Sequence, residues 1–171
     1  MALALTLAIC ACAPRGADEG PTAATLRNAI ESNGAAVALK ALYGDPASWA
    51  FVLRRISSGD SEWFDVAESL RRVSDAGTSE QLDHAAGEAL GTNPALILGR
   101  ATGPFHLSDL CEAPDHDDQR FETLERAISE LDRRISALER LGDPGLSLVR
   151  DDCLASLLGA EQELRRFFTA K

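Results

Sequence analysis

Three histidines and the acids near them are the side chains whose types could support catalysis or metal binding. His116 stands in the run Asp115-His116-Asp117-Asp118, and imidazole and carboxylate groups are both ligands of divalent metal ions. The run lacks the alternating acids, central glycine and closing glutamate of a calcium-binding loop, and no partner histidine is nearby. We therefore expect a solvated loop whose acids favour the start of the next helix, with no metal and no cofactor.

His84 and His106 are the other two candidates. His84 follows Asp83 in a predicted helix, and His106 follows Phe105 in an irregular stretch. Covalent catalysis needs a nucleophile beside a base that a third group orients, and neither histidine has such neighbours in the sequence. The chain also contains no Gly-x-Ser-x-Gly, Ser-x-x-Lys or His-Glu-x-x-His motif and no phosphate-binding glycine loop. The sequence thus supports no assignment of a catalytic residue.

The cysteines indicate export. Residues 2–13 form an uncharged apolar run, too short to span a bilayer and typical of the hydrophobic part of a secretory signal peptide. Ile9-Cys10-Ala11-Cys12 resembles the bacterial lipobox, which makes Cys12 the predicted lipidation site. A soluble periplasmic product after plain signal cleavage is one alternative, and an inner core helix of a cytosolic protein is another. Removal of the leader leaves Cys111 and Cys153, which we expect to form a disulfide rather than two unrelated buried thiols.

Composition limits the fold and the partners. The 171 residues suit one domain, the apolar residues are mostly Ala and Leu, and aromatic residues make up only 5%. The net charge is −10 without any basic run, so we expect no nucleic acid among the partners. We predict an all-α protein with a leader over 1–13, a tether over 14–21 and a single helical domain over 22–171.

Glycine, aspartate and proline mark the ends of the predicted helices. Gly34 separates a helix that begins near Thr22 from another over 35–43. The runs Gly44-Asp45-Pro46, Gly59-Asp60-Ser61 and Gly142-Asp143-Pro144 each predict a corner, with a left-handed glycine, an aspartate cap and a proline or serine in the next helix. Thr78 with Gln81 suggests a capping box, and Asn93-Pro94 suggests a further helix start.

Two related helices flank Gly59. Trp49, Val52 and Ile56 recur fourteen residues later as Trp63, Val66 and Leu70, which places each trio on one helical face. With Phe51 and Phe64, Trp49 and Trp63 could line a ligand groove, although core packing is commoner at this spacing. The pairs Arg54-Arg55 and Arg71-Arg72 occupy equivalent helix ends, where favourable interaction with the helix dipole is a simpler explanation than anion binding.

The carboxyl-terminal third predicts a longer antiparallel helical hairpin. A helix over 120–141 carries apolar residues at alternating spacings of three and four, from Phe121 to Leu138, which is a coiled-coil seam. A second amphipathic stretch follows the Gly142 corner with Leu146, Val149, Cys153 and Leu157 on one side. We expect the seam to pack on this second helix rather than to form a dimer. The whole is then a bundle of short helix pairs that ends in this hairpin.

The segment from Ala47 to Leu98 resembles small exported proteobacterial proteins of unknown function. The likeness rests on Trp49, Trp63, the Ser58-Gly59-Asp60 turn, the run 75–80 and Asn93-Pro94, and it extends to the two later cysteines. It implies a bacterial origin and export but no activity.

We therefore expect a periplasmic, lipid-anchored binding or structural module of the cell envelope, held to the membrane through Cys12 and contacting an envelope protein. The alternative is an envelope hydrolase or metal-dependent enzyme that uses the loop His106–Asp118.

Overall fold

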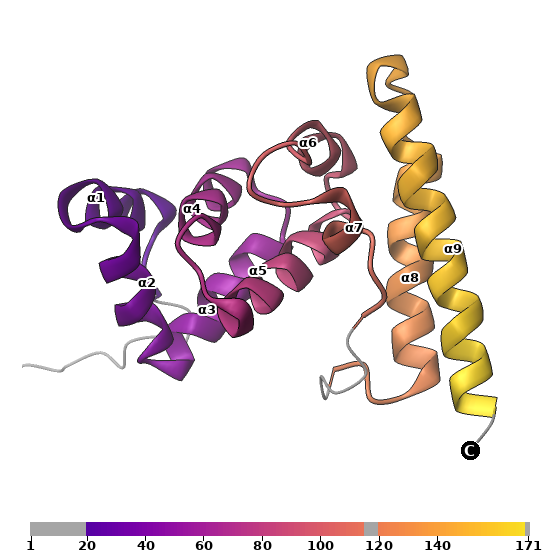
Figure 1. The fold of residues 1–171 in the computed structure, drawn as a ribbon, viewed down its shortest axis with the longest axis horizontal. Coiled ribbons are helices and arrows are strands. Elements are labelled where there is room, and N and C mark those ends of the chain that lie inside the picture. The colour runs from indigo at the N-terminus through magenta and orange to yellow at the C-terminus, as the bar shows by residue number, and fades with distance from the viewer. Residues whose placement is uncertain (1–19, 115–119, 170–171) are drawn as a thin grey trace, which may run out of the picture.

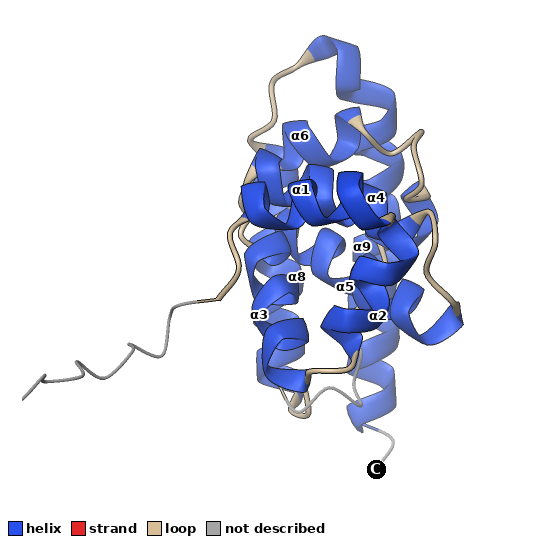
Figure 2. Ribbon diagram, turned by 90° about the vertical axis from the view of Figure 1, so that its left-hand side faces the viewer, coloured by secondary structure: helices blue, strands red, loops and turns tan. Residues whose placement is uncertain are grey.

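The computed structural model describes residues 20–114 and 120–169, and every regular element within them is a helix. The predicted all-α class is confirmed (Figures 1 and 2). The leader, Cys12, most of the tether and the acidic run around His116 lie outside the described residues.

Two groups of helices make up the structure. The first contains α1 (Ala23–Asn33), α2 (Ala35–Tyr43), α3 (Pro46–Ser57), α4 (Ser61–Arg71), α5 (Ala76–Ala89) and α6 (Pro94–Gly99). The second is the hairpin of α8 (Leu124–Glu139) and α9 (Ser147–Thr169), with a 3-10 turn over Pro144–Leu146 before α9. The short α7 (Leu107–Leu110) lies between the two groups (Figure 1).

The three predicted corners exist, and aspartate caps the next element at each. Asp45 accepts a hydrogen bond from the Ala47 amide, Asp60 from the amides of Glu62 and Trp63, and Asp143 from the Gly145 amide. Only Gly59 of the three corner glycines has a positive φ, at 74°. Gly44 is right-handed, with φ −71°, so the expectation of a left-handed glycine at every corner is wrong.

Several predicted boundaries are also wrong. Helix α5 begins before Thr78, because Asp75 is its cap and Thr78 is the returning partner of that capping box. Helix α8 begins at Leu124 behind a Thr123 cap rather than at residue 120, and α9 with 23 residues is the longest helix. The stretch predicted to be irregular contains α7.

The related trios of α3 and α4 form the centre of the first group. All six side chains are buried, and Val52, Ile56, Val66 and Leu70 are fully enclosed. Leu82 of α5 and Leu90, the residue directly after α5, belong to the same hydrophobic core. The fourteen-residue offset thus predicted the buried faces of both helices.

The hairpin is antiparallel as predicted, with α8 packed along α9 (Figure 1). Leu131 and Leu138 on α8 and Cys153 and Leu157 on α9 are fully or almost fully buried between them. The seam therefore packs on its own hairpin partner.

A cysteine pair and hydrogen bonds to backbone carbonyls attach the hairpin to α7 and to the first group. Cys111, directly after α7, and Cys153 on α9 lie at disulfide-bonding distance, with their Cα atoms 5.3 Å apart. On α8, Arg133 Nη2 donates to the Glu88 carbonyl oxygen of α5 at 2.6 Å, and Arg134 Nη1 donates to the Glu112 carbonyl oxygen at 3.2 Å. Arg134 is only 3% exposed, and its Nε also donates to Glu130 Oε1 of its own helix at 2.7 Å. Burial lowers the pKa of Arg134, and the Glu130 carboxylate opposes that effect.

A glycine on α5 makes room for this contact. A Cβ on Gly87 would lie 2.8 Å from the Leu110 carbonyl oxygen and 3.3 Å from Arg134 Nη1. Any larger residue would force the backbone at the end of α7 or the guanidinium to move. Gly87 is thus a packing requirement at the junction between the helix groups.

Candidate functional site: a cleft beside Trp63

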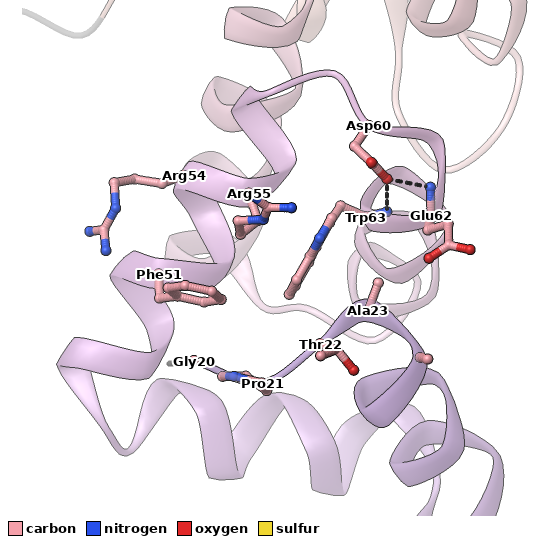
Figure 3. A pocket seen from close by; sticks show the side chains of 11 residues that line it. Gly20, Pro21, Thr22, Ala23, Phe51, Arg54, Arg55, Asp60, Glu62 and Trp63 are labelled. Atoms are coloured by element: carbon pink, nitrogen blue, oxygen red, sulfur yellow. Dashed lines mark hydrogen bonds between the residues drawn. The ribbon is translucent and has the colours of Figure 1, made fainter. Parts of the chain in front are cut away.

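An open cleft of about 750 Å³ lies where the beginning of the described chain crosses α3 and α4 (Figure 3). Its walls come from residues 20–24, from the second half of α3 and from the first turn of α4. A cleft of this volume is within the size range of small-molecule sites, which is about 300–1,000 Å³. It can also receive a short stretch of polypeptide.

Two aromatic rings form the apolar part of the cleft. Phe51 of α3 and Trp63 of α4 meet edge to face, with ring centroids 6.0 Å apart and an interplanar angle of 72°. Trp63 is only 4% exposed, whereas Phe51 is half-buried and presents more of its ring to the solvent. The pair is therefore a rigid apolar surface with Trp63 at the floor and Phe51 at the side.

The segment before α1 packs directly on the Phe51 ring. A Cβ on Gly20 would lie 2.5 Å from Cδ1 and Cε1 of Phe51, closer than any side chain could approach. Thr22, the cap of α1, has the extended dihedrals φ −83° and ψ 158°. The chain thus crosses the aromatic pair as an extended segment without regular secondary structure before α1 begins (Figure 3).

Two arginines from the last turn of α3 supply positive charge. The Arg55 guanidinium lies over the Trp63 ring, 5.6 Å from its centroid, and Arg54 extends outward from the same helix (Figure 3). Within the described residues, neither guanidinium takes part in an ion pair. Both arginines also lie at the carboxyl-terminal end of α3, where a positive charge interacts favourably with the helix dipole. This interaction and a role in the cleft are compatible.

The opposite wall carries carboxylates that have local partners. Oδ1 of Asp60 accepts the amide hydrogens of Glu62 and Trp63 at 2.9 and 3.3 Å and so caps α4. Glu62 lies 3.7 Å from an Arg27 nitrogen in an exposed ion pair. The cleft therefore has a positive α3 side and a negative α4 side, with an apolar floor between them.

This arrangement suits binding more than covalent chemistry. The described residues that line the cleft include no histidine, cysteine or serine, which are the base and nucleophiles that acyl transfer commonly uses. No cluster of three metal-ligating side chains occurs in the ranges 20–114 and 120–169. The cleft can hold a ligand that combines an anion with a flat or extended apolar portion.

The structure separates the two tryptophans that the sequence singled out together. Trp63 lines the cleft, but Trp49 lies elsewhere in the core, where its Nε1 donates to Gln81 and its ring meets Tyr43 edge to face. Phe64 is also core, since it is fully buried against Phe105. Trp49 and Phe64 are thus core side chains and do not line this cleft.

Sequence reasoning did not identify the other walls of the cleft. Gly20 and Pro21 belong to the predicted tether, and Asp60 was assigned only a capping role. The sequence around α4 shows an aspartate cap beside a tryptophan, which could have indicated this wall of the cleft. No local pattern, however, predicts that the tether packs against α3 and α4.

The remaining chemical candidates do not meet in this cleft. His84 is half-buried on α5, and His106 is exposed before α7. Arg71, the equivalent of Arg54, is already engaged: it donates to both carboxylate oxygens of Asp83 at 2.8 and 3.0 Å, which raises its pKa. The two arginine pairs therefore differ in availability although their sequence positions correspond.

Comparison of the chain with models of protein families, with curated proteins and with solved structures finds no match. No helix of the described part has the length and apolar character needed to cross a membrane.

Proposed function

We propose that this chain is an exported, lipid-anchored helical module of the bacterial cell envelope that binds a protein partner in the cleft beside Trp63. The supporting observation is the pair Arg54 and Arg55: neither guanidinium takes part in an ion pair with the described residues, and Arg55 lies over the Trp63 ring while Arg54 stands at the rim of the cleft, in a protein of net charge −10. Arginine and aromatic side chains are the groups that most often dominate the energy of protein interfaces.

Two further features support export and anchoring. Ile9-Cys10-Ala11-Cys12 has the residue pattern of a lipobox, and Cys111 and Cys153 lie at disulfide-bonding distance. Disulfides persist in oxidising compartments such as the periplasm and are rare in the cytosol. Both features are expected of an envelope protein.

The anchor would keep the cleft near the membrane. Gly20 follows Cys12 by eight residues, and a fully extended chain spans at most about 3.5 Å per residue, or roughly 28 Å in all. A partner that reaches this cleft would therefore lie close to the same membrane surface.

The anchor is tested by acylation. The wild-type chain should incorporate labelled palmitate and fractionate with membranes, and Cys12→Ala should lose both properties. A Cys12→Ala chain that keeps both would refute the lipid anchor.

Photo-crosslinking in cells tests the binding role. A photoreactive residue in place of Ala24, an exposed residue that lines the cleft, should capture a discrete envelope protein, while the same residue in place of the exposed Ala155 on α9 is the control. Equal capture at the two positions, or none at Ala24, would contradict binding through this cleft.

A further inference from the structure

The cleft already holds one extended stretch of polypeptide. Gly20, Pro21 and Thr22 cross the Phe51 ring without regular secondary structure, and the closeness of Gly20 to that ring leaves no space for a side chain. Extended, proline-containing segments are recognised elsewhere by aromatic grooves, because the polyproline conformation costs little entropy to order. The surface around Phe51 therefore has the shape and chemistry to receive a second segment of the same kind.

The charges of the cleft specify what such a segment carries. Arg54 and Arg55 form no ion pair with any residue that the structure describes, so an acidic side chain on the α3 side would gain charge-assisted hydrogen bonds without breaking a salt bridge there. On the α4 side, Asp60 and Glu62 disfavour further negative charge but can accept hydrogen bonds from peptide amides.

An anionic membrane surface is a poor match for a cleft with a positive α3 side and a negative α4 side. A bilayer rich in anionic headgroups would bring negative charge to both sides of the cleft at once, including the carboxylates of Asp60 and Glu62. A single extended peptide can place its acids on one side only. The charge distribution thus favours a narrow, asymmetric ligand.

From these features, and resting on the binding role proposed above, we infer that the cleft binds an extended, acidic, proline-containing peptide segment of its partner. Proline packs against the exposed part of Phe51, and the acidic side chains pair with Arg54 and Arg55. Specificity requires proline and acidic side chains in the same peptide segment, because either of them alone is common in proteins.

Fluorescence anisotropy of the full chain tests the inference. The probe is a fluorescein-labelled peptide with the repeating order Asp-Glu-Pro-Gly, compared with one that has Asn and Gln in place of the acids and one that has Ala in place of Pro. We expect binding of the first peptide and about tenfold weaker binding of either altered peptide, since the loss of two exposed charge pairs or of one apolar contact corresponds to roughly a factor of ten.

The matched protein variants separate the cleft from general charge effects. Arg54→Gln combined with Arg55→Gln should weaken binding about tenfold. Arg72→Gln combined with Arg140→Gln removes the same charge from two arginines that likewise have no ion pair in the described part of the chain, and it should change binding by less than about twofold. All four positions are exposed, so unchanged circular dichroism is expected for both variants.

Three results would overturn the peptide assignment: no binding of the acidic peptide, equal weakening by the two double variants, or binding to anionic phosphatidylglycerol vesicles that depends on Arg54 and Arg55. In each of these cases, crosslinking of a protein at position 24 would leave the proposed binding role intact. A loss of that crosslink would instead contradict the role itself.

Discussion

Reduction of the Cys111–Cys153 pair should lower the stability of the folded chain by a large and calculable amount. The two cysteines are 42 residues apart, and their Cα atoms lie 5.3 Å from each other. In the chain-entropy model, opening a loop of this length makes the unfolded chain more favourable by about 4 kcal/mol. This is a large share of the stability of a typical domain, which is about 5–15 kcal/mol.

The position of the bond determines which part of the chain is affected. Cys153 is fully buried on α9, and Cys111 follows directly after α7, so the bond joins the hairpin to the segment that leads out of the first helix group. Arg134 makes the other contact there, by donating to the Glu112 carbonyl at 3.2 Å. Reduction should therefore loosen the junction between α7 and the hairpin before it affects the core of α3 and α4.

Urea unfolding followed by circular dichroism measures the change. The comparison uses oxidised and reduced forms of one full-length chain that carries Cys10→Ser and Cys12→Ser, so that the two forms differ only at this bond. Cys153→Ala is a poorer comparison, because it also removes a buried sulfur from the hairpin. The reduced form should unfold at lower urea concentration and be less stable by about 3–4 kcal/mol.

Two results would refute this reasoning. A stability difference below about 1 kcal/mol would show that the loop is already restricted in the unfolded chain or that the native bond is unfavourable. Intact-mass analysis that finds Cys111 and Cys153 both alkylated, without reductant, in natively exported protein would show that no bond forms.

Two further predictions concern glycine packing and a helix cap. Gly87→Ala should destabilise the fold by about 1–3 kcal/mol, because the new Cβ would lie 2.8 Å from the Leu110 carbonyl oxygen. Gly159→Ala on α9 is the control: its Cβ meets nothing within 4 Å, and the change should stabilise the fold by about 0.5–1 kcal/mol. Thermal unfolding measures both variants, and equal effects would contradict the packing argument. Hydrogen bonds from Thr78 lower the pKa of Asp75 below its ordinary value of 3.8, so the cap should stabilise the fold above that pH and lose its effect as the pH falls through the lower folded value. Asp75→Ala should therefore be less stable than wild type at neutral pH and approach it in acid, and a difference that does not change with pH would contradict the role of the carboxylate.

The helices and most of their ends follow from local sequence. Aspartate caps at residues 45, 60 and 143 were predicted because a short acceptor side chain can satisfy the free amides of a helix start wherever that helix packs. The trios from Trp49 and Trp63 were predicted to be buried because a period of 3.6 residues fixes which side chains share a face. Local errors occurred where two caps compete, as with Asp75 and Thr78 at the start of α5.

Only the tertiary structure decided what each buried face meets. Trp49 and Trp63 have the same spacing, yet one hydrogen-bonds Gln81 in the core and the other lines a cleft, because the segment at Gly20 packs on Phe51 on the side of Trp63 and away from Trp49. Arg134 is buried in the junction although charged residues are usually exposed. The burial of Arg134 depends on its hydrogen bond to the distant Glu112 carbonyl and on the space that Gly87 leaves beside its guanidinium. Neither contact has a local pattern in the sequence. Residue types and periodicity therefore determined the helices, while long-range contacts determined the cleft.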